Sequence, residues 1–518
     1  MKAPSYNLLD EPWMPVRLKN GQTVHLGLLD VFRRSEEIVA LADTSPASLV
    51  AHYRLLVAIF RRALYRDWPQ GWSIEDEADW YENGLPLPLV VDYLEHWRER
   101  FWLFHPEHPF MQVAALAFAP ETCDKVKPWT QVSLASASGN TPLVFDHSCD
   151  DIPSEVAPGV ALTHLLGFLQ FTPGGLVKTI RASDKSGPLA NTAALIPLGD
   201  TLARTLLLCL PPFVAAQAEH DLPAWEQQAP SVADLLRAPT IAAGPNDRYT
   251  RQTRAVLLLL EESGGVRWIR FAAGVALEED DSAPDPMASY RPGSNGLVRL
   301  TFTQGRAVWR DLPTLLPNPV GKSRAAATLL HALSLHEELD GAVPVYQPLL
   351  VAGLASDQAK LERWRAEQLV LPSVLLHDVD KLQFLGELLE RAERFFFDLR
   401  GLGALMLASA LPDPDNKDTR SRARSMLDNS PFSATYFSAA ELAMPELLGL
   451  LAETRISEAD HAWSTALRQA ARDAWDLLLE GMGKSGKVLL AVAPFYPLFV
   501  GLLNKQLPIT EPSAEDAI

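Results

Sequence analysis

Cysteine is scarce in this chain of 518 residues, which contains only Cys123, Cys149 and Cys209. None of the three belongs to a Cys-x-x-Cys pair, so the sequence has no disulfide framework. We therefore expect a reducing, cytoplasmic setting. The stretch from Met1 to Asp10 lacks a charged segment followed by an apolar one, so we expect no signal peptide.

Long hydrophobic runs are also lacking. The longest runs from Val488 to Leu503, and Pro494 and Pro497 interrupt it. It is shorter than the roughly 20 residues that a bilayer-spanning helix needs. We interpret it as a buried helix with a proline kink and expect no membrane partner.

Positive charge is in deficit. The chain has 46 Lys and Arg against 64 Asp and Glu, a formal net charge of −18. Because neutralising phosphates is the main contribution to nucleic-acid affinity, this balance counts against a free-standing nucleic-acid-binding protein. It is compatible with a subunit of a complex whose other members supply positive charge.

Catalytic motifs are the fourth absence, since the chain has no Gly-x-Ser-x-Gly nucleophile elbow. Gly483-Lys484-Ser485 resembles the end of a phosphate-binding loop, but Leu478 stands where that loop needs its first glycine, and no strand precedes it. We interpret the segment as a turn between two helices. We predict a protein that is not an enzyme and holds no metal and no small-molecule cofactor.

One stretch does suggest a metal site, the segment 105–112 with the sequence HPEHPFMQ. A zinc protease places two histidines four residues apart on one helical face, whereas His105 and His108 are three apart and each precedes a proline. A residue before proline is driven out of the helical conformation, so the two need not share a face. We interpret the segment as a rigid bend that places Phe104, Phe110 and Met111 in a core.

The alternative for this segment is a metal-dependent hydrolase that uses His105, Glu107 and His108. Stoichiometric zinc that disappears when both histidines are changed would favour it.

The pattern of apolar residues predicts an α+β protein with two different parts. Up to about Pro372 short strands and helices mix, and Asn20-Gly21 between two apolar runs predicts a hairpin. Four long amphipathic segments with short connections follow. We therefore predict a large mixed α/β N-terminal domain over 1–372 and an antiparallel C-terminal four-helix bundle over 373–518.

Three spaced segments together point to a known family. They are 7–9 with 13–17 (NLL and WMPVR), 105–112 (HPEHPFMQ) and 353–359 (GLASDQA). In this order and spacing the chain resembles the CasA family, the large subunit of the type I-E CRISPR Cascade complex. The resemblance covers most of the chain, including its C-terminal helices.

The resemblance implies a non-catalytic subunit of an RNA-guided antiviral complex. Such a subunit recognises the protospacer-adjacent motif (PAM) in double-stranded DNA, starts target unwinding and helps to recruit a helicase-nuclease. Base pairing with the guide RNA reads the rest of the target. The implied partners are the guide RNA-containing Cascade subunits, the duplex target and the helicase-nuclease. The alternative within this family is a purely structural scaffold.

A glycine-rich loop of the family approaches the minor groove with its backbone, and Gly174 and Gly175 match it. The physical basis is that glycine has no Cβ to keep the main chain away from a base edge. The alternative is an ordinary turn after a helix.

A glutamine wedge of the family splits the first base pair of the target, and Gln358 matches it. Ala359 lies beside the wedge, and Lys360 follows. The alternative is that Gln358 is exposed in a loop before a helix over 360–367.

In one respect the chain departs from the family. The element that adds a lysine to the motif groove should fall near 274–279, where this chain has no lysine. Lys178, Arg181 and Lys360 are the candidate substitutes, so the sequence leaves the preferred PAM open.

Two further contacts are expected. The family loop that touches the guide end and neighbouring subunits corresponds to about 144–159, with Phe145 as its anchor. In the bundle, a basic run is interpreted as contacting phosphates of a displaced strand, with a solvated helix face as the alternative. This run comprises Lys417, Arg420, Arg422 and Arg424.

Overall fold

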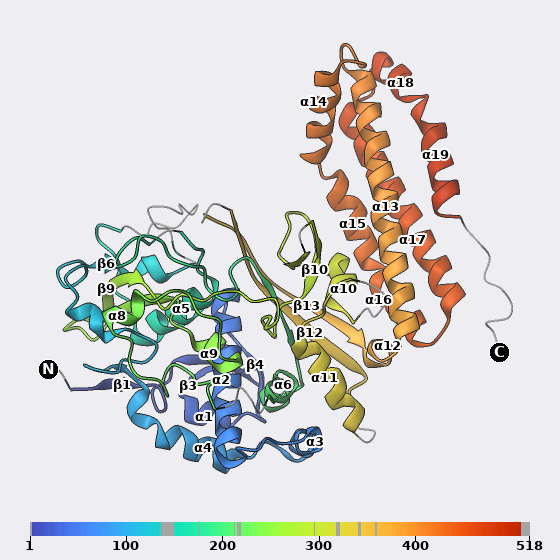
Figure 1. Ribbon diagram of the computed structural model, residues 1–518. Coiled ribbons are helices and arrows are strands. Elements are labelled where there is room, and N and C mark those ends of the chain that lie inside the picture. The colour runs from blue at the N-terminus through green and yellow to red at the C-terminus, as the bar shows by residue number, and fades with distance from the viewer. Residues whose placement is uncertain are drawn as a thin grey trace. The chain divides into compact units, whose positions relative to one another are not determined.

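The computed structural model describes residues 3–134, 136, 150–175, 177–211, 213–214, 219–294, 296–317, 322–339, 343–357 and 360–508, with side chains except at 356–363. The chain divides into two compact units, 1–304 with 322–370 and 305–321 with 371–518. The first mixes helices and strands and the second is helical, which confirms the predicted α+β class (Figure 1).

Helix α2 (Pro46–Asp67) forms the centre of the first unit. The Ser45 side chain caps it by accepting a hydrogen bond from the Ser48 N–H at 3.4 Å. Its residues from Pro46 to Leu64 are buried, because α4, α5 and α9 pack around it. The other helices of this unit are α1 (Leu28–Arg33), α3 (Ile74–Asn83), α4 (Leu87–His96), α5 (Pro158–Phe171), α6 (Leu202–Leu208), α8 (Val232–Leu235), α9 (Pro245–Thr250) and α11 (Ala327–Glu338).

Charged side chains of α2 are buried and form ion pairs, because an unpaired buried charge would destabilise the folded state. Arg54 Nη2 lies 2.8 Å from Asp285 Oδ2, and Arg61 Nη1 lies 2.5 Å from Asp221 Oδ2. All four side chains are almost fully buried. These pairs connect α2 to segments far away in the sequence.

The strands of the first unit form small sheets. The predicted hairpin is confirmed as β2 and β3, with Val16 opposite Val24. The sheets described are β1 (Ser5–Asn7) with β5 (Trp102–Phe104), β3 (Thr23–Leu26) with β2 (Met14–Leu18) and β4 (Ile38–Leu41), β6 (Lys127–Pro128) with β9 (Val266–Ala273) and β8 (Arg254–Leu260), β10 (Tyr290–Gly293) with β11 (Gly296–Arg299), and β13 (Lys360–Pro372) with β12 (Tyr346–Asp357) and β7 (Ala193–Pro197).

The second unit is built around two long helices, α13 (Val379–Ala410) and α17 (Ile456–Met482). The other predicted bundle segments are divided into shorter helices, since prolines stand at or next to their starts, at Pro431, Pro445 and Pro494. The shorter described helices are α10 (Leu312–Leu315), α12 (Ser373–Leu376), α14 (Lys417–Asp428), α15 (Phe432–Leu442), α16 (Met444–Ala452), α18 (Gly486–Val492) and α19 (Phe495–Gln506).

Residues 305–321, which the sequence placed in the N-terminal domain, belong to the second unit. Arg310 Nε lies 2.7 Å from Glu393 Oε1 of α13. Trp309 packs edge-on against Trp463 of α17, with ring centroids 6.2 Å apart. These contacts join segments that are distant in sequence, so no local sequence pattern predicts them.

The glycine-lysine-serine segment is a turn between two helices, as predicted. Gly483 ends α17 with a φ of +83°, a conformation that favours glycine. The Ser485 side chain caps α18 by accepting a hydrogen bond from the Val488 N–H at 3.3 Å.

The prediction that the last apolar run is a buried helix was wrong. Its break at Pro494 is present, but Leu490 and Leu498 are 80% and 56% exposed. By length and composition alone, Gly486–Gln506 would be able to cross a membrane, a test that core helices of soluble proteins also pass. The expectation of no membrane partner stays a prediction.

Candidate nucleic-acid interface

The histidine-proline bend joins the core of the first unit. Phe110 and Met111 are 2% and 5% exposed, as the interpretation of a docked bend requires, and Phe104 is partly buried against the same core. Nδ1 of His105 accepts the backbone N–H groups of Glu107 and His108 at 3.1 and 2.9 Å. Because this nitrogen is committed to the turn, the geometry favours a structural bend over the hydrolase alternative.

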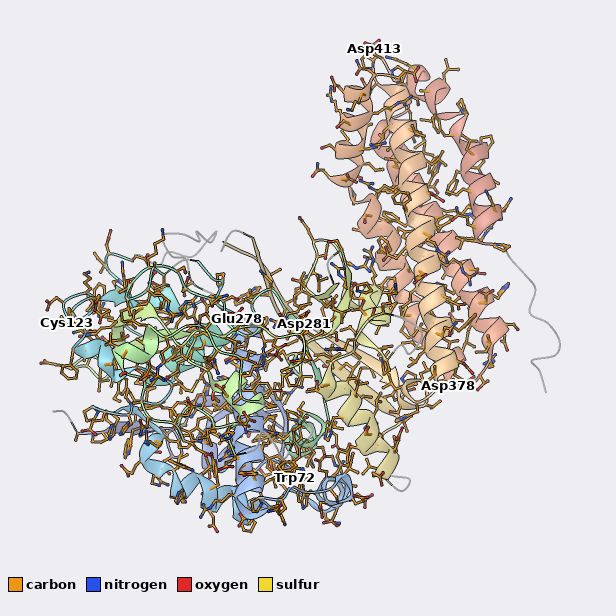
Figure 2. All side chains as sticks on the ribbon, in the orientation of Figure 1. Trp72, Cys123, Glu278, Asp281, Asp378 and Asp413 are labelled. Atoms are coloured by element: carbon orange, nitrogen blue, oxygen red, sulfur yellow. The ribbon has the colours of Figure 1, made fainter. Side chains whose placement is uncertain are left out.

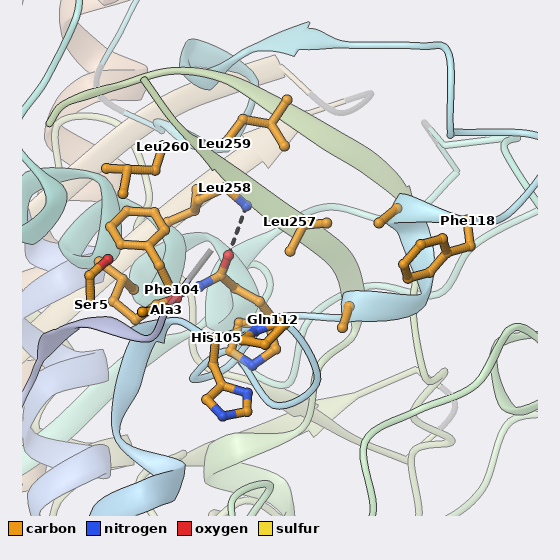
Figure 3. Close-up of a pocket in the computed structure, with 15 residues that line it drawn as sticks. Ala3, Ser5, Phe104, His105, Gln112, Phe118, Leu257, Leu258, Leu259 and Leu260 are labelled. Carbon is orange, nitrogen blue, oxygen red and sulfur yellow. Dashed lines mark hydrogen bonds between the residues drawn. The ribbon is translucent and has the colours of Figure 1, made fainter. Parts of the chain in front are cut away.

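Gln112, the last residue of the bend, ties it to strand β8. Its Nε2 donates to the Leu103 carbonyl at 2.7 Å. Its Oε1 accepts the Leu258 N–H at 2.7 Å, the bond drawn in Figure 3. The bend and β8 line a cavity of about 380 Å³ whose walls are mainly apolar. We therefore assign the bend to support of the fold.

The glycine loop, defined as residues 172–175, begins directly after α5. The last residue of α5 is Phe171, which is fully buried. Gly174 is half-buried and Gly175 is exposed. Gly175 has a φ of +87°, which a residue with a side chain adopts only under strain. The loop is therefore anchored at its start and exposed at its second glycine.

A buried ion pair contacts the glycine loop. Arg254 and Asp184 have side chains 0% and 1% exposed, and their Nη2 and Oδ2 atoms lie 2.6 Å apart. Arg254 also donates to the carbonyls of Pro173 and Lys185 at 2.5 and 2.6 Å. Oδ1 of Asp184 accepts the Gly175 N–H at 2.5 Å. Burial lowers the pKa of Arg254 to about 10, which leaves it charged at neutral pH.

Strands β12 and β13 form a long hairpin (Figure 1). Gln358 and Ala359 stand between the two strands and lie outside the described residues. Lys360 begins β13, and its side chain is also not described. The alternative of a helix over 360–367 was wrong, because pairing with β12 overrides the helical propensity of this segment.

The glycine loop and the hairpin start from the same place in the core. On β12, Gly353 lies opposite Ala193 of β7. A Cβ at Gly353 would lie 2.2 Å from the Thr192 carbonyl oxygen and 3.1 Å from the Phe171 ring, so only glycine fits. Phe171 directly precedes the glycine loop, and Gly353 lies on β12, the strand that precedes Gln358 in the sequence. The roots of the two predicted DNA-binding elements are therefore adjacent.

The stretch 274–279, where the family places a lysine, is fixed to the core. Ala276 and Leu277 are 5% and 3% exposed. Glu278, labelled in Figure 2, places its Oε2 3.3 Å from Nζ of Lys185. Lys185 is about half-exposed and comes from the segment that returns from the glycine loop. Sequence reasoning missed this base because only the fold brings it to the stretch.

The predicted substitutes are less well placed or lie outside the description. Lys178 is exposed, and Arg181 donates to the carbonyl of Arg237. The side chain of Lys360 and the whole of Phe145 lie outside the described residues.

The basic run of the second unit lies on α14, where its four side chains are exposed. Three of them, Lys417, Arg420 and Arg424, share one helical face, while Arg422 points roughly 160° away from Arg420 around the axis. Arg420 Nη2 lies 2.7 Å from Asp415 Oδ1. The run therefore offers one three-residue basic face that is partly neutralised.

Comparison with known proteins decides the family. The model of the family "CRISPR-associated protein Cse1" matches residues 7–474. The chain belongs to the Cse1 family. The CasA/Cse1 protein of Thermus thermophilus is 34% identical over 510 residues, which cover 96% of this Cse1 chain and 97% of the relative. The resemblance inferred from the sequence is thus confirmed.

Solved structures agree with this assignment. The structure of Thermus thermophilus CasA (Cse1) superposes with a TM-score of 0.82 at 32% identity and covers 97% of this chain and 100% of that one. Thermobifida fusca Cse1 shares the fold at 23% identity, with a TM-score of 0.78 and coverages of 98% and 99%. So does a chain of a CRISPR RNA-guided surveillance complex, at 22% identity, with a TM-score of 0.72 and coverages of 96% and 100%.

Proposed function

We propose that this Cse1 chain is the non-catalytic large subunit of a type I-E Cascade complex in the cytoplasm. In this role it recognises the PAM in double-stranded DNA, starts unwinding beside it and helps to recruit the helicase-nuclease. The observation that carries the proposal is the common root of the glycine loop and the β12–β13 hairpin at Phe171 and Gly353. A common root lets one element touch the motif while the other acts on the adjacent base pair.

The glycine loop is the proposed contact with the motif. Gly174 and Gly175 bring main-chain groups to the minor groove, where A·T and G·C pairs differ but the orientation of each pair is poorly distinguished. Lys185 supplies a positive charge beside the loop. A subunit that reads the motif in this way accepts several PAM sequences.

The hairpin is the proposed wedge. Gln358, with Ala359 beside it and Lys360 on the adjoining strand, enters the stack next to the motif and nucleates opening. Guide RNA-containing subunits supply most of the phosphate neutralisation, because this chain carries a net charge of −18. Phe145 contacts the guide end, and the basic face of α14 contacts the displaced strand.

The decisive experiment is duplex binding by the reconstituted complex, with and without this chain, across a library of motif sequences. We expect binding to require the chain and to depend on the motif. Binding that needs neither would refute the proposal.

The wedge is tested separately with Gln358→Ala in the same complex. We expect at least about tenfold slower opening of the first base pair, since unstacking a base step costs a few kcal/mol. A fluorescent base analogue at that pair reports opening. The matched control is Gln368→Ala, an exposed glutamine of β13. Unchanged opening in Gln358→Ala supports the scaffold alternative.

A further inference from the structure

The buried Arg254–Asp184 pair contacts main-chain groups on both sides of Gly174. Arg254 holds the Pro173 carbonyl at 2.5 Å, and Asp184 holds the Gly175 N–H at 2.5 Å. Arg254 also holds the Lys185 carbonyl in the returning segment at 2.6 Å. Bonds to charged groups are about twice as strong as neutral ones, and burial protects them from water. The pair therefore fixes the orientation of two successive peptide groups.

The planarity of the peptide group determines the directions of the Gly174 N–H and carbonyl groups. In a planar trans peptide the carbonyl and the N–H point in opposite directions, and the described chain has no cis peptide bond. Because the Pro173 carbonyl points to Arg254, the Gly174 N–H points away from the pair. Because the Gly175 N–H points to Asp184, the Gly174 carbonyl also points away from the pair. In the described part of the chain neither group of Gly174 has a hydrogen-bond partner.

We propose that Arg254 and Asp184 are positioning residues that make Gly174 present a donor and an acceptor together to base edges in the minor groove. This inference rests on the proposed function of the glycine loop. The donor suits the acceptors that all base pairs offer there, and the acceptor suits the amino group that only G·C pairs add. The pair thereby determines which motifs the loop accepts without touching DNA itself.

The test uses the reconstituted complex and measures motif discrimination, the ratio of Kd values between disfavoured and favoured motifs. For Arg254→Met we expect the ratio to fall at least about tenfold. Binding to a target whose first base pairs are already mismatched should stay within about twofold, because opening then no longer depends on the motif. Backbone hydrogen exchange over 172–189 should become faster. A general loss of structure would weaken both kinds of binding.

Two further variants keep the test informative if Arg254→Met destabilises the chain. The double variant Arg254→Met/Asp184→Asn leaves no buried unpaired charge but still frees the Pro173 carbonyl, so discrimination should remain low. Arg254→Lys keeps the charge but lacks the planar fork, so it should recover discrimination only in part. The matched control is Arg61→Met, which breaks the buried pair with Asp221 and should keep wild-type discrimination.

The outcomes separate this inference from the proposed function. If the wild-type complex discriminates and Gly175→Ala reduces the discrimination, but Arg254→Met and the double variant keep it, the positioning role is overturned. If the wild-type complex does not discriminate, the proposed function fails, and with it the role of the pair in recognition. If Arg61→Met loses discrimination as strongly as Arg254→Met, the effect is one of general stability and the inference is also overturned.

Discussion

At the scale of single residues, the buried ion pairs of the first unit are the features that are hardest to predict from the sequence. Arg54 and Arg254 look like ordinary surface arginines in the sequence, yet both side chains are fully buried. Their carboxylate partners come from distant loops, so no local pattern reveals them. Gly174 and Gly175, in contrast, were predicted as site residues through the resemblance to the family, whereas the local pattern alone favoured an ordinary turn after a helix.

His52 provides a prediction at this scale. It is 0% exposed, and burial lowers its pKa to about 3 from the ordinary 6.5. In the unfolded chain this histidine gains a proton below pH 6.5, while in the folded chain it stays neutral until about pH 3. The free energy of unfolding should therefore fall as the pH decreases through this window, by up to about 1.4 kcal/mol per unit.

Urea unfolding between pH 7 and 4.5 measures this effect. His52→Gln does not titrate, so its stability should fall less steeply with decreasing pH than that of the wild type. Other groups that titrate in this range, such as His164, are common to both proteins. Equal slopes would show that His52 contributes nothing to the acid sensitivity.

At the scale of elements, strand pairing and prolines determined the secondary structure of segments for which local propensity was not sufficient. The segment 360–367 has helix-forming residues but pairs as β13. The predicted long helices of the bundle end where prolines stand, at Pro431, Pro445 and Pro494. The prolines are visible in the sequence. The strand β13 instead depends on its neighbour β12, which lies between β13 and β7 in the sheet.

The link between the bend and β8 leads to a prediction for Gln112. Gln112→Glu removes the donor to the Leu103 carbonyl and introduces a charge into a site that is 2% exposed. We expect a loss of about 3 kcal/mol in the free energy of unfolding at pH 7.5. Because a buried carboxyl has a raised pKa and donates again when protonated, the loss should shrink at lower pH.

Chemical unfolding at two pH values tests this link, with Gln22→Glu as the control because Gln22 is exposed. The control should stay within about 0.5 kcal/mol of the wild type. A Gln112→Glu protein as stable as this control would contradict the role of the bend as a support.

At the scale of the whole molecule, the charge balance limits the proposed binding to DNA. The net charge of −18 makes non-specific attraction weak, so binding has to come from local contacts and from partner subunits. The exposed face of Lys417, Arg420 and Arg424 on α14 is the proposed local site in the second unit.

Replacing Lys417, Arg420, Arg422 and Arg424 by glutamine tests this face in the assembled complex. Each lost phosphate contact with single-stranded DNA should make the slope of log K against log salt shallower by about 0.7. We expect a total change of up to about 2, because Arg422 lies off the common face. Lys484→Gln with Lys487→Gln, which removes exposed charges elsewhere in the unit, is the control. An unchanged slope would identify the run as a solvated helix face.

The sequence by itself determined the family, the α+β class, the β2–β3 hairpin and the helical C-terminal part. These features depend on local periodicity, turn residues and spaced motifs, which survive without knowledge of contacts. Only the tertiary structure decided that Arg254 and Asp184 hold the glycine loop and that Lys185 reaches 274–279. It also decided that 305–321 joins the second unit. The physical reason is the same in each case, because a buried ion pair or a long-range packing contact is specified by two distant segments together and by neither alone.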